Sequence, residues 1–308
     1  MKPLPALIAL LLLSACIKTE TIVVDQSVVL GQKVLISDDP YPPVLHAEGW
    51  QQPEPLPAPV STAGAEDSPF IMPDGKTLYF FFTPDPSIPP EKQVIDGITG
   101  IFETTLTETG WSTPKRVVLQ DKGKLSLDGC FFTDGSVAWF CSAREGYTGV
   151  NLFTARLKDG KWQDFTYAGD QLKGYEAGEM HLSSNGNELY FHSGRAGGKG
   201  GLDIWVTRRD GSAWSAPENI EAVNTPDNEG WPFLSQDGSE LWLLRTVNGT
   251  PAIFRSVKQN GQWQAPELIV SQFAGEPSLD NAGNLYFVHH YYKDGKMLEA
   301  DIYVAKKE

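Results

Sequence analysis

The sequence predicts an all-β fold made of repeated four-stranded antiparallel sheets, and three observations lead to this prediction. A phrase that contains a turn, a tryptophan and a proline recurs, as in TGWSTPKRVV (109–118), GSAWSAPENI (211–220) and GQWQAPELIV (261–270). Between these phrases, an apolar run, an Asp-Gly or Asn-Gly type turn and an alternating aromatic run recur together, which is a hairpin signature. Glycine (30), proline (22) and 11% aromatic residues are typical of many short strands joined by tight turns.

Each repeat is expected to contain four strands in a fixed order. The first two strands form the hairpin, and the five hairpins begin at Ser68, Gly129, Glu179, Trp231 and Glu276. Third strands are expected from Gly100, Val150, Leu202, Ala252 and Ala300. The fourth strand carries the tryptophan, and the five tryptophans are Trp50, Trp111, Trp162, Trp214 and Trp263, separated by 61, 51, 52 and 49 residues. Four antiparallel strands in about fifty residues make up a β-propeller blade.

We expect a five-bladed β-propeller that is closed by the N-terminal strand. The last repeat stops after its third strand, whereas EGWQQPEPLP (48–57) precedes the first hairpin. The N-terminal strand is therefore expected to complete the last blade and to remove free sheet edges. In every blade the tryptophan should anchor the outer strand on the neighbouring sheet. The proline, which lacks a backbone N–H, should occupy a position on the edge strand where no ladder hydrogen bond is needed. The second repeat departs from this pattern, because GKWQDFTYAG (160–169) lacks the proline. A sixth blade would need strands from residues 17–47.

Two segments carry a resemblance to a known family. SPFIMPDGKTLYF (68–80) and HSGRAGGKGGLDIWV (192–206) resemble the WD-like propeller repeats of the TolB type, found in periplasmic and surface proteins of bacteria. The resemblance covers residues 48–308 and implies a propeller fold. It says little about function, because this repeat serves scaffolds, receptors and domains attached to enzymes.

The N-terminal residues are typical of a targeting signal followed by a linker. Residues 1–15 have one lysine and an apolar run that is too short to span a bilayer, as in a signal peptide. The stretch LSAC resembles a bacterial lipobox, which implies that Cys16 becomes the lipidated (palmitate-bearing) first residue of a mature lipoprotein. Ile17 follows instead of Asp, which implies the outer membrane, with the propeller in the periplasm or at the cell surface. Residues 16–47 are expected to form a linker, and residues 48–308 the propeller.

The formal net charge of −14 restricts the partners. A strongly acidic surface disfavours nucleic acid and anionic lipid headgroups. We therefore expect contact with the membrane through the lipid anchor only, and an envelope protein or glycan as partner.

Acidic residues recur where the innermost strands begin, facing the expected central channel. The candidate ligand-binding residues are Glu66, Asp67, Glu179, His181, Glu229 and Glu276. Such carboxylates could bind a cation or act as acid and base on a sugar, as in the five-bladed glycosidases that this arrangement resembles. In that alternative the catalytic residues would be Glu66, Glu179, Glu229 and Glu276. We favour a structural role, in which the carboxylates pair with arginines of neighbouring blades, since Arg144, Arg195 and Arg245 follow the second strands.

No motif for a cofactor, a phosphate or a tight metal site is present, so we expect none, although a structural cation in the channel stays open. Cys130 and Cys141 flank one hairpin, and both a disulfide and two buried thiols are compatible with that spacing. The insertion Thr83–Gly100 breaks the repeat and is a candidate recognition loop.

The expected function is therefore a non-catalytic cell-envelope lipoprotein whose propeller binds a protein or envelope ligand. The alternative is a glycan-active enzyme that uses carboxylates at the mouth of the channel.

Overall fold

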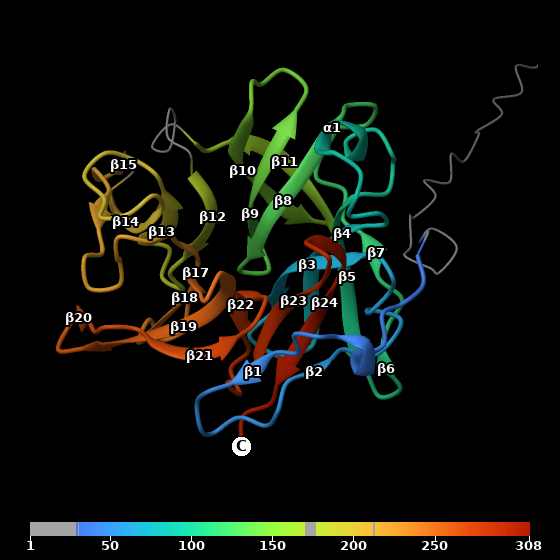
Figure 1. Cartoon of the computed structure of the whole chain (residues 1–308). Coiled ribbons are helices and arrows are strands. Elements are labelled where there is room, and N and C mark those ends of the chain that lie inside the picture. Colours follow the sequence, from blue (N-terminus) through green and yellow to red (C-terminus); the bar gives the residue numbers. More distant parts are fainter. Residues whose placement is uncertain (1–28, 30, 170–176, 212) are drawn as a thin grey trace, which may run out of the picture.

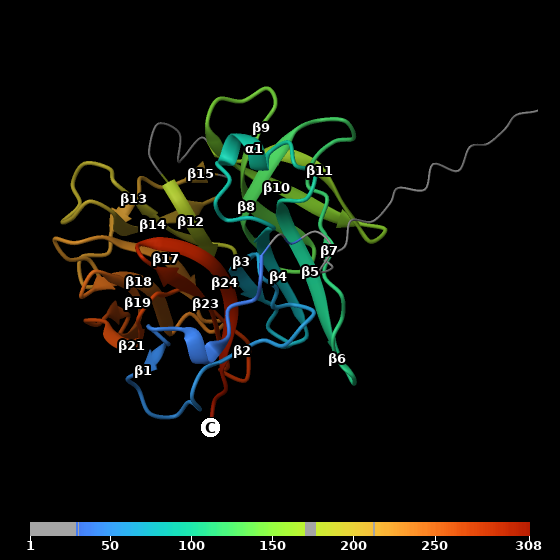
Figure 2. The ribbon, with the colours of Figure 1, turned by 45° about the vertical axis from the view of Figure 1, so that its right-hand side comes forward.

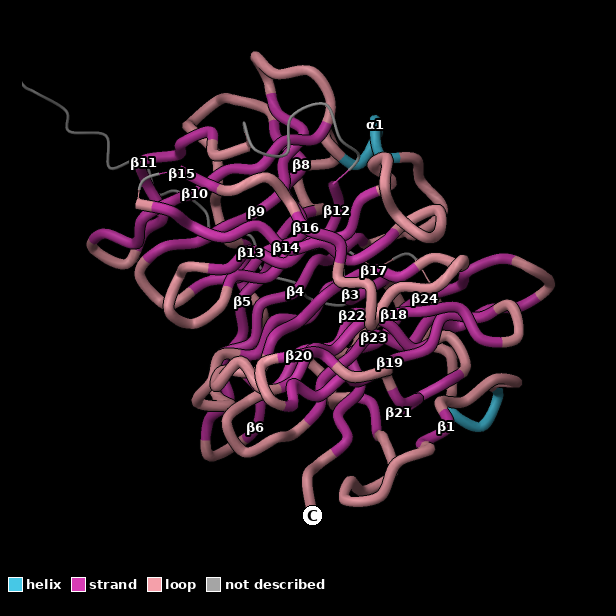
Figure 3. The backbone as a smooth tube through the Cα atoms, turned by 90° about the vertical axis from the view of Figure 1, so that its left-hand side faces the viewer, coloured by secondary structure: helices cyan, strands magenta, loops and turns pink. Residues whose placement is uncertain are grey.

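The computed structural model describes residue 29 and residues 31–169, 177–211 and 213–308. Almost all regular structure is strand (Figure 3), which confirms the predicted all-β class. Two short helical segments occur, η1 (Ile36–Asp38) and α1 (Pro90–Gln93). The predicted signal peptide and Cys16 fall outside the described residues. Within them, no helix is long and apolar enough to cross a membrane.

The strands form five successive antiparallel units, which we number in chain order. Unit 1 contains β3 (Ala65–Ile71), β4 (Thr77–Thr83), β5 (Gly100–Thr107), β6 (Gly110–Trp111) and β7 (Lys115–Arg116). Unit 2 contains β8 (Ser126–Thr133), β9 (Val137–Arg144), β10 (Val150–Lys158) and β11 (Lys161–Tyr167). Unit 3 contains β12 (Ala177–Leu182), β13 (Glu188–Ser193), β14 (Asp203–Asp210), β15 (Ala213–Trp214) and β16 (Glu218–Asn219).

The last two units follow the same order. Unit 4 contains β17 (Glu229–Leu234), β18 (Glu240–Val247), β19 (Thr250–Gln259), β20 (Gln262–Trp263) and β21 (Glu267–Ser271). Unit 5 contains β22 (Ala274–Leu279), β23 (Leu285–Lys293) and β24 (Lys296–Ala305). Each unit is a meander, in which the first three strands pair in order and, in units 1 to 4, the outer strand or its two segments pair with the third.

The units surround a centre lined by their first strands. In Figures 1 and 2 the colours pass around the molecule from cyan through green, yellow and orange to red. β3 contacts β8, β8 contacts β12, β12 contacts β17, β17 contacts β22, and β22 contacts β3. The hydrogen bonds nevertheless define four sheets and not five, since one parallel pair, Ala300 with Ala65, joins units 5 and 1 into a nine-stranded sheet.

The N-terminal segment adds strands to two units. β2 (Glu54–Pro55) pairs antiparallel with β24, so the predicted pairing of the first strand with the last is confirmed. The C-terminus accordingly lies beside the blue N-terminal segment in Figure 2. β1 (Val44–Leu45), within the predicted linker, pairs with β21 and thereby extends unit 4.

Proline explains why most outer strands are interrupted. In units 1, 3 and 4 the proline of the repeat separates a two-residue strand that carries the tryptophan from the strand that follows. Unit 2 lacks this proline, and its outer strand β11 continues without a break from Lys161 to Tyr167. The missing N–H of proline removes one ladder hydrogen bond, so the strand stops and resumes.

Three of the repeat tryptophans make ring contacts with the preceding unit, as the repeat predicts. Trp214 meets Trp139 edge to face with ring centroids 6.5 Å apart, and Trp263 meets Tyr190 at 6.2 Å. Trp50 meets Trp242 of unit 4 at 5.8 Å, so it connects the N-terminal segment to its neighbour. These aromatic contacts join successive units where few backbone hydrogen bonds do.

Candidate functional site

The ring of strands has two faces, which we name for the rest of the text. The loop face is where the first strand of each unit begins. The turn face carries the hairpin turns between first and second strands, at residues 72–76, 134–136, 183–187, 235–239 and 280–284. The sequence-predicted acidic residues divide between the loop face and the channel.

Two loop-face carboxylates are held by arginine. Arg144 donates to Asp128 at 2.9 Å, and Arg245 donates to Glu229 at 2.7 Å, with both carboxylates buried. The predicted arginine pairing is therefore present, but the prediction that the pairs link neighbouring blades is wrong. β8 pairs with β9 and β17 with β18, so each arginine faces the carboxylate of its own unit. Glu229 is structural.

Glu66 is buried without such an arginine. Its carboxylate accepts from the backbone N–H of Thr62 at 3.0 Å and from the Thr62 hydroxyl at 2.5 Å. Thr225 makes the same two bonds to Glu229, at 2.8 and 2.6 Å. Burial, followed by the nearby charge of Asp301, raises the pKa of Glu66 well above its usual value.

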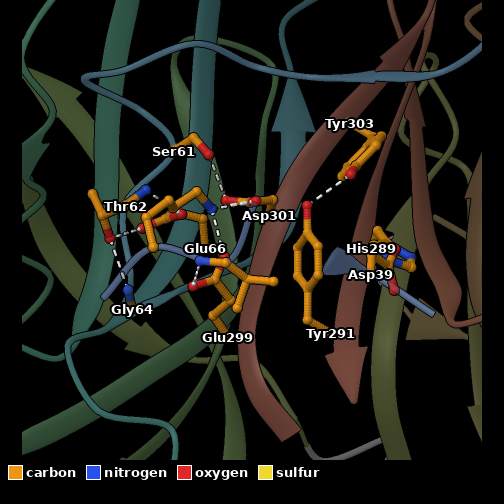
Figure 4. A network of polar contacts seen from close by, with 12 residues as sticks. Asp39, Ser61, Thr62, Gly64, Glu66, His289, Tyr291, Glu299, Asp301 and Tyr303 are labelled. Atoms are coloured by element: carbon orange, nitrogen blue, oxygen red, sulfur yellow. Dashed lines mark hydrogen bonds and ion pairs between the residues drawn. The ribbon is translucent and has the colours of Figure 1, made fainter. Parts of the chain in front are cut away.

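The carboxylates Glu66, Glu299 and Asp301 lie near one another (Figure 4), and a lysine of the predicted linker compensates their charge. Lys33 contacts Glu299 at 2.7 Å and also contacts Asp301, and both of these carboxylates are buried. The Ser61 hydroxyl donates to Asp301 at 2.5 Å. The segment of residues 31–47 is therefore attached to unit 5 by buried polar contacts.

Five side chains converge at the centre from equivalent bulges of the first strands. The register shifts in every first strand, and Ser68, Cys130, Trp231 and Glu276 have positive φ of 47–55°. Together with Glu179 they line a cavity of about 40 Å³. This volume is sufficient for about one water molecule.

Burial dominates the chemistry of that central cavity. Glu179 accepts from the Ser68 hydroxyl at 3.1 Å, and burial together with neighbouring Cys130 raises its pKa well above the usual value. Burial and the charge of Asp67 raise the pKa of Glu276 in the same way. Burial is the largest influence on Asp67 and acts to raise its pKa, but the nearby His290 at 3.7 Å, together with hydrogen bonds from Glu276 and the Ser68 N–H, lowers the pKa overall.

Cys130 lies at the wall of the same cavity, and Cys141 lies on the neighbouring strand β9. Cys130 and Cys141 are both free thiols, which is one of the two arrangements that their spacing allows. Cys141 is opposite Gly129 in the ladder, so the bulge places Cys130 one residue beyond direct register.

Four rings separate the central cavity from the turn face. Phe70, Phe132, His181 and Phe233 occupy equivalent positions just after the bulges, and they line both cavities. His181 lies 4.4 Å from Phe233, 5.4 Å from Phe132 and 6.1 Å from Phe70 between ring centroids. This set, named here the aromatic floor, closes the channel.

A larger cavity of about 620 Å³ opens on the turn-face side of the aromatic floor. Ligand pockets typically have about 300–1,000 Å³. Its wall includes Trp139, and its rim is formed by the hairpin turns with Asp134, Asp237 and Asp280. We call it the turn-face cavity.

His181 is the one sequence-predicted residue that lines the turn-face cavity, and it is a neutral imidazole. Its Nδ1 accepts the backbone N–H of Leu234 at 3.1 Å, which assigns the proton to Nε2. Burial lowers the pKa of His181 to about 3. His192 accepts the Trp231 N–H in the same manner, and burial lowers its pKa to about 4.

This pKa predicts a pH dependence of stability. Unfolded His181 takes up a proton near pH 6.5, whereas folded His181 does not until about pH 3. Stability from this group is therefore complete above pH 6.5 and is lost as the pH falls. His181→Phe introduces the phenylalanine that units 1, 2 and 4 have at this position. As the pH falls from 6 to 4, the free energy of unfolding of this variant should rise relative to that of the wild type by about 1.4 kcal/mol per pH unit. Urea titrations at several pH values measure this, and a constant difference would contradict it.

The structure thus brings together Asp67, Glu179, His181 and Glu276 near the channel and leaves Glu66 and Glu229 on the loop face. Within the described part of the chain, no group of three or more His, Cys, Asp or Glu side chains is placed to hold a metal ion. The aromatic floor and the turn aspartates were missed, although the floor recurs at one repeat position and the aspartates recur within the hairpin turns.

Comparisons with known proteins identify the fold. No family model and no curated protein sequence matches. An endo-arabinase from Bacteroides thetaiotaomicron has a similar structure, with a TM-score of 0.54, 15% identity, and coverage of 83% of this chain and 98% of that one. An alpha-L-arabinofuranosidase from Lactobacillus brevis has a TM-score of 0.51 and 11% identity, with coverage of 80% of this chain and 92% of that one. TolB from Acinetobacter baumannii has a TM-score of 0.45 and 14% identity, with coverage of 80% of this chain and 56% of that one. The chain therefore has a propeller-like fold similar to those of the endo-arabinase and the arabinofuranosidase, and identities this low define the fold alone.

Proposed function

We propose that the chain is a non-catalytic envelope lipoprotein with a five-bladed β-propeller, and that it binds a protein on its turn face. One observation carries the proposal. The carboxylates that a glycosidase would need are either hydrogen-bonded on the loop face or line a cavity of only about 40 Å³, whereas the turn-face cavity, at about 620 Å³, has the size of a ligand pocket. The five units and the contacts among their first strands support an architecture of five blades, although the hydrogen bonds define four sheets.

The cellular place of the protein rests on its N-terminus. The lipobox-like stretch before Cys16 supports a lipid anchor in the outer membrane. Labelling cells with a radioactive or clickable palmitate should mark the wild type and leave Cys16→Ser unlabelled. Label on the variant would refute the anchor.

A glycan-active enzyme is the second candidate, and one observation favours it. Asp67 has a lowered pKa and its neighbour Glu276 a raised one, which is how a base and an acid are divided in many active sites. Two structures with similar folds are named as arabinan-degrading enzymes. Against this candidate, a sugar ring does not fit into about 40 Å³.

Affinity capture separates the two candidates. The detergent-solubilised lipoprotein should retain a defined protein from envelope extracts and should release no reducing sugar from arabinan or other polysaccharides. Deleting 84–94 removes α1 and the candidate recognition loop on the loop face, and capture should persist. Sugar release that disappears in Glu276→Gln would establish the enzyme instead, and loss of capture in the deletion would move the binding surface to the loop face.

A further inference from the structure

The turn-face cavity has a chemistry that selects its occupant, and this inference rests on the proposed function. Its base is the aromatic floor, and its wall includes Trp139, which is 9% exposed and parallel to Phe132 at 6.3 Å. Aromatic faces attract organic cations, and indole attracts them most strongly.

This fold places cations on several of its tryptophans. Lys307 lies 3.3 Å from the ring centroid of Trp50, Lys258 lies 4.7 Å from Trp263, and Arg209 lies 4.8 Å from Trp214. Arg255 lies 5.6 Å from Trp242. No cation of the described residues lies over Trp139, whose indole lines the cavity.

The rim of the cavity carries fixed negative charge. Asp134 accepts the backbone N–H groups of Ser136 and Val137 at 2.7 Å, and Asp237 accepts the N–H of Ser239 at 3.0 Å. Asp280 makes equivalent bonds, at 2.9 Å to Ala282 and 3.0 Å to Asn284. These turn bonds hold the aspartates in place.

The turns favour the ionised form of two rim aspartates, Asp134 and Asp237, and the described lining offers them no basic side chain. For Asp134 the turn hydrogen bonds outweigh burial, and for Asp237 the bond from Ser235 acts first, so both pKa values are lowered. No lysine or arginine belongs to the described lining of the cavity, and His181 is neutral. The fourth acid of the lining, Glu240, is already bound by Arg255 at 3.1 Å.

We propose that the turn-face cavity binds a lysine or arginine side chain that projects from the partner protein. The alkyl stem packs on the aromatic floor, the cationic group lies over Trp139, and the charge faces Asp134, Asp237 and Asp280. The volume of about 620 Å³ accommodates the basic residue together with its neighbours in the partner chain.

Calorimetry on the detergent-solubilised full-length lipoprotein tests this inference with short peptides. The probes are N-acetyl-Gly-Lys-Gly amide and its arginine counterpart, and the controls carry Nε-acetyl-lysine or norleucine at the same position. The basic probes should bind about tenfold or more tightly than either control, and the difference should shrink as salt rises. Equal binding of the acetylated peptide would overturn the proposal without any mutation.

Matched variants locate the binding. Asp134→Asn, Asp237→Asn and Asp280→Asn together remove the charge but keep an acceptor oxygen for each turn, and they should weaken the basic probes about tenfold. Asp74→Asn is the control, because Asp74 caps the corresponding turn of unit 1 through the Lys76 N–H at 2.9 Å but does not line the cavity. Unchanged affinity in the triple variant would overturn the inference.

The failure of this inference is distinguishable from failure of the proposed function. If the triple variant still captures the envelope partner with wild-type affinity, the cavity is not the site, although the protein remains a binding module. If no partner is captured and polysaccharide is hydrolysed, the proposed function itself fails.

Discussion

Arg245→Ala is expected to lower the free energy of unfolding by about 3–5 kcal/mol, among the largest effects of any single substitution in this chain. Arg245 donates to Glu229, whose side chain is 0% exposed, and to the carbonyl of Val223 at 2.8 Å. Its guanidinium also lies 4.7 Å from the ring of Phe254. Removing it leaves a buried carboxylate with only the donors of Thr225, so the charge must be desolvated without compensation.

Arg208→Ala is the matched control for Arg245→Ala. Arg208 also contacts two glutamates, Glu188 at 2.9 Å and Glu218 at 2.5 Å, but its side chain is 46% exposed. Exposed pairs contribute about 0–1 kcal/mol, so this variant should unfold nearly as the wild type does. Urea denaturation measures both variants. Similar losses in the two would mean that the loop-face carboxylates are not held as buried ion pairs.

Lys33→Met should destabilise the protein by about 3 kcal/mol at neutral pH, because it removes a cation from buried Glu299 and Asp301. The difference in the free energy of unfolding between this variant and the wild type should become smaller as the pH falls. Burial raises the pKa of Glu299 and of nearby Glu66, and these groups take up protons more readily once the lysine is gone. The residues before the first hairpin would then be a structural part of the propeller and not a free linker.

Lys124→Met is the control for Lys33→Met. Lys124 pairs with Glu145 at 2.7 Å, and the two side chains are 57% and 50% exposed. Its removal should leave the denaturation midpoint unchanged, because an exposed ion pair contributes little to stability. If Lys33→Met behaves as Lys124→Met does at every pH, residues 31–47 do not contribute to folding.

The fold was predictable because the same sequence pattern, which predicts the same arrangement of strands, recurs in each repeat. The tryptophan phrase predicts an outer strand that packs on its neighbour, and Trp214 on Trp139 and Trp263 on Tyr190 confirm it. The missing proline of the second repeat corresponds to the uninterrupted strand β11. Periodicity could not give the sheet count, which depends on one pair between Ala300 and Ala65.

The site was less predictable, because its chemistry depends on distances across the ring. Composition identified the acids, but it could not show that Glu229 is neutralised within its own unit or that Glu179 is enclosed. The linker was expected to be extended, whereas Lys33 meets residues more than 260 positions away. Asp134 and its equivalents read as ordinary turn residues, and only the geometry shows that they surround one cavity.

Site-specific photocrosslinking in intact cells tests the central claim most directly. A photoreactive amino acid at Gln236, on the rim of the turn-face cavity, is compared with one at Ser87, in the loop-face insertion. We predict that Gln236 crosslinks to a single envelope protein and that Ser87 does not. Crosslinks from Ser87 alone, or none from Gln236 while the partner is still captured, would contradict binding at the turn face.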